Sequence, residues 1–479
     1  MNLRSLIRKT EVTRFLGVAA SLGVAAGLLL GCSSAVSPAT GSNINSPSVS
    51  VPVLITDAPS APLVAFTLTL DSITLTDTAG QTASVLSSPT TIEICHLNGI
   101  QAPLLTANVP EDTYVSATIT FSDPQITYIN SSGQPVTVSP TLATTSFKLT
   151  FPAPITISNT STSLLVDLLA AQSVTISGTT VTVNPVFNVT NVPPPSTIPP
   201  PGPNGTGMQQ MGTVVSVSGT TLVIEPGSGP NFTLTTNSAT VLQGFSSLST
   251  LTAGELVQVD FVLQSGGVFL ATRIQLAPPP PSGQPPINLL NGTVTSVSSG
   301  SFQMVVMQGL GPAANPASPT AVSAFTVTTN SSTTFAITPQ FQSLTGLPFT
   351  PTFTASNLTA GQTVGVLASS VTGTTAVASS VDLIPQTLGG VVTAISTVGS
   401  YTAYTLTLVG GDAFTSLTGA STVTVYTSAA TAGPVAATAI NNTPIKVGSQ
   451  VRFNGLVFNT GSGTFAMVAG CSPDGPPGI

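Results

Sequence analysis

A repeated order of short sequence blocks constrains the fold of this chain more than any other feature. The blocks GTVVSVS (212–218), FTLTTNS (232–238) and LTAG (251–254) return in the same order as GTVTSVS (292–298), FTVTTNS (325–331) and LTAG (358–361). Gly389 opens a third, divergent copy, in which Gly448 stands where Gly254 stands in the first. Ordered self-similarity of this kind indicates duplication of one structural unit. The second half of the chain is therefore predicted to hold three copies of one small fold.

Each copy alternates apolar residues with Thr, Ser and Gln, and carries a glycine at a fixed turn. The alternation of Val257, Val259 and Phe261 with polar neighbours is typical of a half-buried strand. Gly254, just before it, suits a turn that needs positive φ. The copies resemble a bacterial family of domains of unknown function (5666-like), well over 212–276, with insertions over 292–384 and weakly over 390–469. The resemblance implies a small β-barrel of the OB type.

The preceding module also reads as strands. Phe66, Leu68 and Leu70 alternate with polar residues, and the parity then changes near Asp71-Ser72, which predicts a β-bulge. Residues 115–121 predict a half-buried strand that ends at Asp123-Pro124, and a turn is expected at Ser132-Gly133. Over 163–171 the leucine spacing favours a helix as well as a strand, although nine residues are marginal for a helix.

A second resemblance rests on two motifs of this module, ITDAP at 55–59 and VPEDTY at 109–114. They resemble the signature segments of a bacterial lipoprotein domain of unknown function (4382-like), over about 51–189. Ile55 replaces the family's Leu, and Glu111-Asp112 replaces its Ala-Gly. The resemblance implies a β-sandwich of the prealbumin or carbohydrate-binding type, and it brings no functional residues with it.

The N-terminus predicts export and lipid anchoring. Four basic residues precede an apolar run over 15–30 that is short for a membrane-spanning helix. The run ends at Leu29-Leu30-Gly31-Cys32, which resembles a lipoprotein cleavage motif: Gly31 precedes the cut and Cys32 takes the lipid, here expected to include palmitate. Ser33 in place of Asp favours the outer membrane by analogy with lipoprotein sorting. An ordinary signal peptide with an incidental Cys is the alternative.

These features and two proline-rich stretches, which favour extended polyproline II structure, divide an all-β chain into nine segments. They are a signal peptide (1–31), a flexible tether (32–50), a β-sandwich (51–192), a linker (193–210), repeat 1 (211–277), a linker (278–288), repeat 2 (289–385), repeat 3 (386–471) and a tail (472–479).

Charge excludes one class of partner. Only 5% of the 479 residues are charged, and the chain without 1–31 keeps four basic residues against fourteen acids, a net charge of −10. Nucleic-acid binding needs a basic surface, so nucleic acid is not expected as a partner. The expected partners are the membrane, through the N-terminal lipid, and a glycan or protein ligand at the cell surface.

No residue pattern predicts catalysis, a metal or a cofactor. The only histidine, His96, adjoins Cys95 and Glu93, but neighbours in a strand point to opposite faces, so an incidental pair is favoured over a nucleophile. Glu111-Asp112 fit a solvated turn better than a calcium site. Cys95 and Cys471 are expected to stay unpaired, with a disulfide as the alternative.

The weak ligand candidates are Asp57, Tyr401 and Tyr404. Asp57 is expected to cap a local turn, with a metal role as the weaker alternative. The absence of Trp counts against a sugar-stacking platform, and the two tyrosines are equally suited to the core. The sequence predicts a non-catalytic, lipid-anchored scaffold, adhesion or ligand-binding protein of the cell envelope, and a carbohydrate- or cell-wall-binding protein as the alternative.

Overall fold

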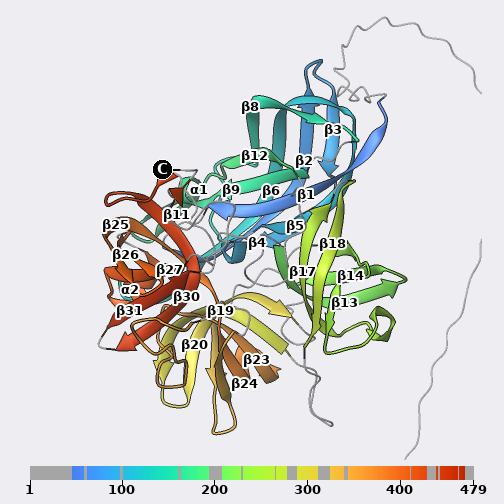
Figure 1. The fold of residues 1–479 in the computed structure, drawn as a ribbon. Coiled ribbons are helices and arrows are strands. Elements are labelled where there is room, and N and C mark those ends of the chain that lie inside the picture. Colours follow the sequence, from blue (N-terminus) through green and yellow to red (C-terminus); the bar gives the residue numbers. More distant parts are fainter. Residues whose placement is uncertain are drawn as a thin grey trace, which may run out of the picture. The chain divides into compact units, whose positions relative to one another are not determined.

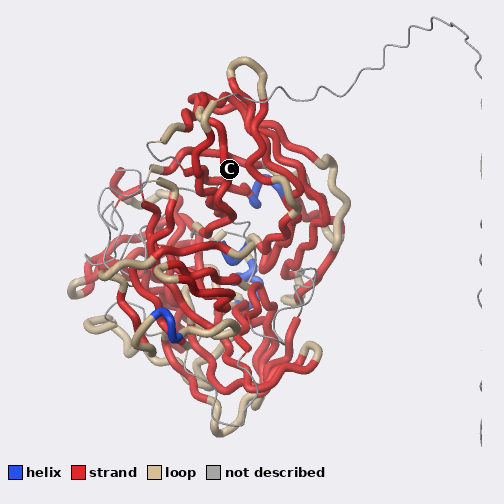
Figure 2. The backbone as a smooth tube through the Cα atoms, turned by 90° about the vertical axis from the view of Figure 1, so that its right-hand side faces the viewer, coloured by secondary structure: helices blue, strands red, loops and turns tan. Residues whose placement is uncertain are grey.

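A computed structural model describes most of the compact unit Asn43–Ile479, which is built almost entirely of strands (Figures 1 and 2). The described residues are 46–58, 62–97, 101–159, 163–193, 208–227, 230–264, 266–277, 288–310, 324–338, 344–409, 412–428, 439–440, 443–461 and 463–469. The predicted signal peptide with Gly31 and Cys32, the C-terminal tail and Cys471 lie outside these ranges. So do most residues of the tether and of both linkers.

The first module has the two facing sheets that a β-sandwich requires. Its elements are β1 Ser48–Ala58, β2 Leu63–Asp77, β3 Thr82–Leu86, β4 Thr90–Glu93, the 3-10 turn η1 Cys95–Leu97, β5 Ala102–Pro110, β6 Asp112–Ile129, β7 Pro135–Val138, β8 Ser146–Ile157, β9 Ser163–Leu169, α1 Ala170–Ser173, β10 Val174–Ser177, β11 Thr180–Val183 and β12 Phe187–Val192. One sheet has the order β12-β9-β1-β5, and the other has β3-β2-β6-β7 with β4 on β2 and β8 on β6. The apolar faces of both sheets contribute to one hydrophobic cluster.

The longest strand pair, β2 with β6, confirms one expectation and corrects another. The register shifts between Leu70 and Ser72, so Asp71 sits in the predicted bulge. The expected end at Asp123-Pro124 is wrong, because β6 continues to Ile129. Asp123 instead forms an irregularity with φ 48, after which Gln125 pairs again with Thr67. Pairing with both β2 and β7 carries the strand past its own proline. The predicted turn at Ser132-Gly133 is confirmed between β6 and β7.

The ambiguous leucine-rich segment folds as a strand followed by one helical turn. Leu164, Val166 and Leu168 are buried at alternate positions, the period of a strand. β9 lies between β1 and β12, and two neighbours supply ladder hydrogen bonds that an isolated short helix lacks. Strands also begin earlier than the expected boundaries: β1 starts at Ser48, within the expected tether, because Ser48 already pairs with Pro110.

The three repeats form three five-stranded barrels with one topology. The first contains β13 Met208–Ser218, β14 Thr221–Pro226, β15 Phe232–Thr235, β16 Val241–Gln243, η2 Leu248–Thr250, β17 Leu256–Gln264 and β18 Val268–Leu276. The second contains β19 Asn288–Ser298, β20 Ser301–Leu310, β21 Ala324–Thr328, β22 Thr334–Ile337, β23 Thr363–Thr372 and β24 Thr375–Leu383. The third contains β25 Gln386–Val398, β26 Tyr401–Leu408, α2 Ala413–Thr418, β27 Thr422–Ser428, β28 Ala439–Ile440, β29 Thr443–Pro444, β30 Gln450–Gly461 and β31 Thr464–Ala469.

Counting only the five strands that close each barrel, which leaves out β16, β22, β28 and β29, the first strand pairs with the second and fourth, and the third pairs in parallel with the fifth. These closures are β15 with β18, β21 with β24, and β27 with β31. This order of strands agrees with the small OB-like barrel that the resemblance of the repeats implied. β13 and β19 begin at Met208 and Asn288, so both barrels start inside the expected linkers.

In every barrel a turn at the LTAG position is held to the first strand by the same pair of main-chain hydrogen bonds. The N–H groups of Gly254, Gly361 and Gly448 each donate over 2.8 Å to a carbonyl of the first strand, on Val214, Val294 and Val392. The N–H groups of these valines donate back to the residues after the glycines, Glu255, Gln362 and Ser449. All three glycines have φ between 86 and 92. We call this arrangement the turn lock. It confirms that Gly448 corresponds to Gly254.

The second and third barrels also share a hydrophobic cluster. Leu456 and Phe458 of β30 pack with the core of the second barrel, and Phe349 stacks near Phe458 with ring centroids 5.6 Å apart. The buried Gln362 amide donates to the Val457 carbonyl over 2.9 Å. These contacts make the second and third repeats one packed body rather than two independent modules.

Candidate functional site

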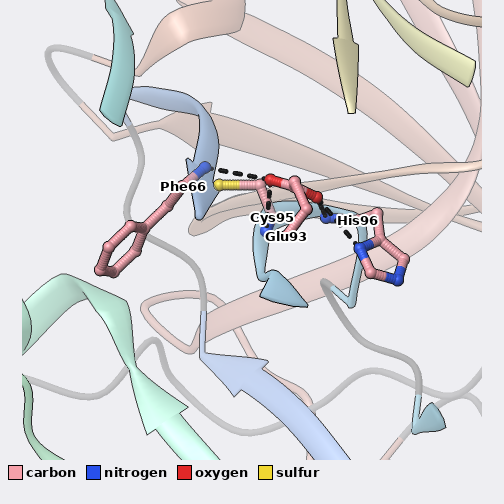
Figure 3. Close-up of polar contacts among 4 residues, drawn as sticks. All are labelled: Phe66, Glu93, Cys95 and His96. Atoms are coloured by element: carbon pink, nitrogen blue, oxygen red, sulfur yellow. Dashed lines mark hydrogen bonds and ion pairs between the residues drawn. The ribbon is translucent and has the colours of Figure 1, made fainter. Parts of the chain in front are cut away.

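The only histidine lies in a hydrogen-bonded cluster at the end of β4. Glu93 ends this strand, and Cys95 and His96 open the 3-10 turn η1 directly after it. The Glu93 carboxylate accepts from the backbone N–H groups of Phe66 (3.0 Å), Cys95 (3.0 Å) and His96 (2.9 Å). It also bonds His96 Nδ1 over 3.0 Å (Figure 3). Glu93 thereby satisfies the exposed N–H groups of a short turn, which is a structural task.

The cysteine and histidine of this cluster do not form a nucleophile pair. Figure 3 shows the Cys95 sulfur and the His96 ring on different sides of Glu93. Burial raises the pKa of the Cys95 thiol well above its usual value, and the charges of Glu93 and Asp57 raise it further. A thiol with a raised pKa carries little thiolate, which is the nucleophilic form. Cys95 is a free thiol in the described part of the chain. Cys471, the possible disulfide partner, lies outside the described residues, so the expectation that the two cysteines stay unpaired remains a prediction.

Asp57 is buried in β1, and the expectation of a local turn cap is wrong. Its side chain is 3% exposed. Burial raises its pKa well above the usual value, and the neighbouring Asp167 and Glu93 add to this, while Ala170 N–H and Arg452 act in the opposite direction. The Ala170 N–H approaches the carboxylate without meeting the geometry of a full hydrogen bond at either oxygen. Burial is the largest of these influences, so it favours the neutral form of the Asp57 carboxyl.

Arg452, from a distant part of the sequence, is near enough to lower the pKa of Asp57 slightly against the effect of burial. Arg452 comes from β30 of the third barrel, and its Nε and Nη1 atoms are buried without a hydrogen bond. Sequence analysis missed this arrangement. The available signal was a lone arginine between two apolar residues, Val451 and Phe453, in a chain with few basic residues. Among the described residues, no three His, Cys, Asp or Glu side chains are placed to hold a metal ion.

A second missed charge pair lies in the first barrel. Arg273 Nη2 is 2.8 Å from Asp260 Oδ2, and the two residues face each other across β17 and β18. Both side chains are largely buried, at 11% and 4% exposure. Because each charge is matched by its neighbour, the pair serves the barrel wall rather than a reaction.

The carboxylates of Glu111-Asp112 both accept backbone hydrogen bonds. Glu111 Oε1 accepts from Asn159 N–H over 2.6 Å, and Asp112 Oδ1 accepts from Thr113 N–H over 2.7 Å. Glu111 is the single residue between β5 and β6, and Asp112 is the first residue of β6.

The tyrosines proposed as ligand contacts are core residues. Tyr404 is 1% exposed and stacks near Phe453 with ring centroids 5.5 Å apart. Tyr401 is 4% exposed, and its hydroxyl donates to the Thr345 carbonyl over 3.0 Å. Neither ring offers an open face for a sugar. Of the two interpretations of these residues, their burial favours the core.

Comparison with known families agrees with both sequence resemblances. Residues 48–185 match the family model described as Domain of unknown function (DUF4382). Residues 211–275 match the one described as Domain of unknown function (DUF5666). The chain is thus an all-β protein that joins two kinds of domain without an assigned activity. A comparison with curated proteins found no match. No helix in the described part of the chain is long and apolar enough to span a membrane.

Proposed function

We propose that the protein is a non-catalytic, lipid-anchored component of a bacterial cell envelope, whose β modules serve as a scaffold, adhesion or ligand-binding array. The observation that carries the non-catalytic part is the separation of the two reactive side chains around Glu93. The Cys95 sulfur and the His96 ring lie on different sides of this carboxylate (Figure 3), and burial raises the pKa of the thiol. A general base has to lie beside the nucleophile that it activates, and the His96 ring points away from the Cys95 sulfur.

The anchoring part rests on the sequence motif at Gly31-Cys32 and on the expected sorting to the outer membrane. More than one acyl chain on Cys32 would hold the protein stably at a bilayer. The mature chain would then present its β modules to the periplasm or to the cell exterior.

The alternative, binding of carbohydrate or cell wall, gains support from one surface. The outer side of the sheet containing β2 and β6 carries closely spaced hydroxyl groups instead of charges or aromatic rings.

A panel of turnover assays tests the non-catalytic proposal. The purified mature chain is expected to show no turnover of esters, peptides, phosphate esters or glycans. Turnover that survives purification and disappears in His96→Gln, while circular dichroism shows a folded protein, would overturn the proposal. Loss of stability without any activity in either protein is the outcome that a structural Glu93–His96 contact predicts.

A further inference from the structure

One face of the N-terminal sandwich is a regular grid of hydroxyl groups. The grid spans the adjacent strands β3, β2, β6 and β8 (Figure 1). Its rows follow the strand register: Thr82, Thr76, Ser116 and Thr150; then Ser84, Thr74, Thr118 and Lys148; then Ser72, Thr120 and Ser146. Every member but Lys148 carries a hydroxyl. We call these eleven residues the hydroxyl face.

The residues between the grid positions point the other way, into the core. Ile73, Leu75, Ala117 and Ile119 are at most 1% exposed. Since successive side chains of a strand alternate between faces, the hydroxyl residues point outward. The Ser72 and Thr120 hydroxyls lie 2.6 Å apart, which places both on one side of the sheet. The side chains at both edges are exposed, most inner ones are partly exposed, and Ser116 alone is buried.

The chemistry of this face selects a neutral partner. A hydroxyl both donates and accepts a hydrogen bond, so a row of hydroxyls can pair with other hydroxyls in either direction. Lys148 is the only charge within the grid. The two acids of β2 next to the grid already accept hydrogen bonds: Asp71 from the Ser122 hydroxyl over 2.9 Å, and Asp77 from the N–H groups of Ala79 and Gln81 over 2.8 and 2.7 Å. An anionic polymer needs a cluster of cations, which the face lacks.

The geometry of the face favours an ordered partner over a free sugar. Neighbouring strands are about 4.8 Å apart, and alternate residues along a strand are about 6.7 Å apart, so the hydroxyls repeat in two directions. Each hydrogen bond replaces one to water and gains little by itself. Only a ligand that repeats its own hydroxyls can engage many of them at once.

We propose that the hydroxyl face binds the surface of an ordered, neutral polysaccharide through several simultaneous hydrogen bonds. This proposal rests on the ligand-binding part of the proposed function and gives it a partner class and a surface. It requires neither the lipid anchor nor the absence of catalysis.

The experiment measures retention of the full mature chain, purified as Cys32→Ser, on microcrystalline cellulose and on chitin. The test variant replaces four inner hydroxyl residues, Thr74, Thr76, Thr118 and Thr120, by Val, which keeps the branched shape that strands favour. Loss of four hydroxyls is expected to reduce retention on at least one of these solids by about tenfold or more. The matched Thr→Ser variant keeps the hydroxyls and is expected to be retained like the starting protein.

A control variant carries Thr180→Val and Thr182→Val on β11, whose side chains are exposed in the same module but outside the grid. It is expected to be retained normally, and circular dichroism checks that all variants are folded. Equal retention of the Thr→Val and starting proteins, or no retention of the starting protein on either solid, would overturn the proposal. So would retention that is lost in Lys148→Gln or at high salt, because that would show that charge, and not the hydroxyl groups, holds the protein on the solid.

Sedimentation velocity adds a last discriminating outcome. A dimer of the starting protein that dissociates in the Thr→Val variant would identify the face as an interface between copies, and would also overturn the proposal. The anchoring and non-catalytic parts of the proposed function have separate assays, so their failure cannot be confused with failure here.

Discussion

Replacing Asp412 by Asn should make the third barrel more stable at pH 8 and change it little at pH 4. Asp412 is the N-cap of α2, and its Oδ1 accepts from Phe414 N–H over 2.7 Å. The side chain is 8% exposed. Burial raises its pKa from 3.8 to about 7, although the N–H groups of Phe414 and Thr415 act against the rise. Asn keeps an oxygen for the cap and carries no charge.

The sign and size of the effect follow from the two pKa values. The folded protein binds the Asp412 proton more tightly than the unfolded chain does. Protonated Asp412 therefore makes its full contribution to the free energy of unfolding below about pH 3.8. It is lost as the pH rises toward about 7. At 1.36 kcal/mol per pH unit, the buried charge at pH 8 costs about 4 kcal/mol, an upper estimate that Asp412→Asn should largely recover.

Urea unfolding followed by tyrosine fluorescence measures this contribution. The chain has no Trp, and three of its five tyrosines, Tyr401, Tyr404 and Tyr426, belong to the third barrel. The Asn and starting proteins should unfold at similar urea concentrations at pH 4 and separate progressively above it. Asp412→Ala removes the cap as well, so it should be less stable than the Asn variant by about 1 kcal/mol at both pH values. A stability difference between Asn and Asp that does not change with pH would refute the reasoning.

Three further predictions concern anchoring, modularity and barrel closure. Cys32→Ser should move the protein from the detergent phase to the aqueous phase in phase partitioning, and unchanged partitioning would contradict lipidation. Limited proteolysis should cut first in the proline-rich stretches 194–207 and 278–287, which precede β13 and β19, whereas a first cut within 115–121 would contradict the domain map. Gly292→Ala should lower the free energy of unfolding by about 3 kcal/mol or more, because its Cβ would lie 2.1 Å from the Val305 carbonyl oxygen. The control is Gly389→Ala, whose Cβ would lie 3.3 Å from Arg452 Cγ and 3.7 Å from the Val451 carbonyl oxygen.

The parts of the fold that sequence analysis predicted are those encoded by neighbouring residues. The bulge at Asp71 follows from a change of parity, and the turn at Gly448 follows from spacing to the next apolar pair. Long-range packing decided the rest. Asp123-Pro124 lies inside a strand because the neighbouring strands β2 and β7 extend past it. Asp57 is buried because its strand, β1, lies between β9 and β5, which join the sheet from later parts of the chain.

The candidate site illustrates the same division. Proximity of Glu93, Cys95 and His96 was visible in the sequence, but their orientation depends on the 3-10 turn and on the Phe66 N–H, which joins them from another strand. The hydroxyl face was present as Thr-rich alternation in separate segments. Only the strand register showed that these segments place their hydroxyl groups side by side.

The turn lock has a consequence for how the three copies can evolve. Its two hydrogen bonds use main-chain atoms, and its one strict demand on sequence is the glycine with positive φ. Selection for this turn therefore constrains few of its side chains, and the other positions of the turn can change in sequence. The position after the glycine is Glu255, Gln362 or Ser449 in the three copies, and each reaches back to the N–H three residues earlier. A barrel whose turn is held by main-chain hydrogen bonds can gain an insertion such as α2, or share its core with a neighbouring barrel, without losing its topology.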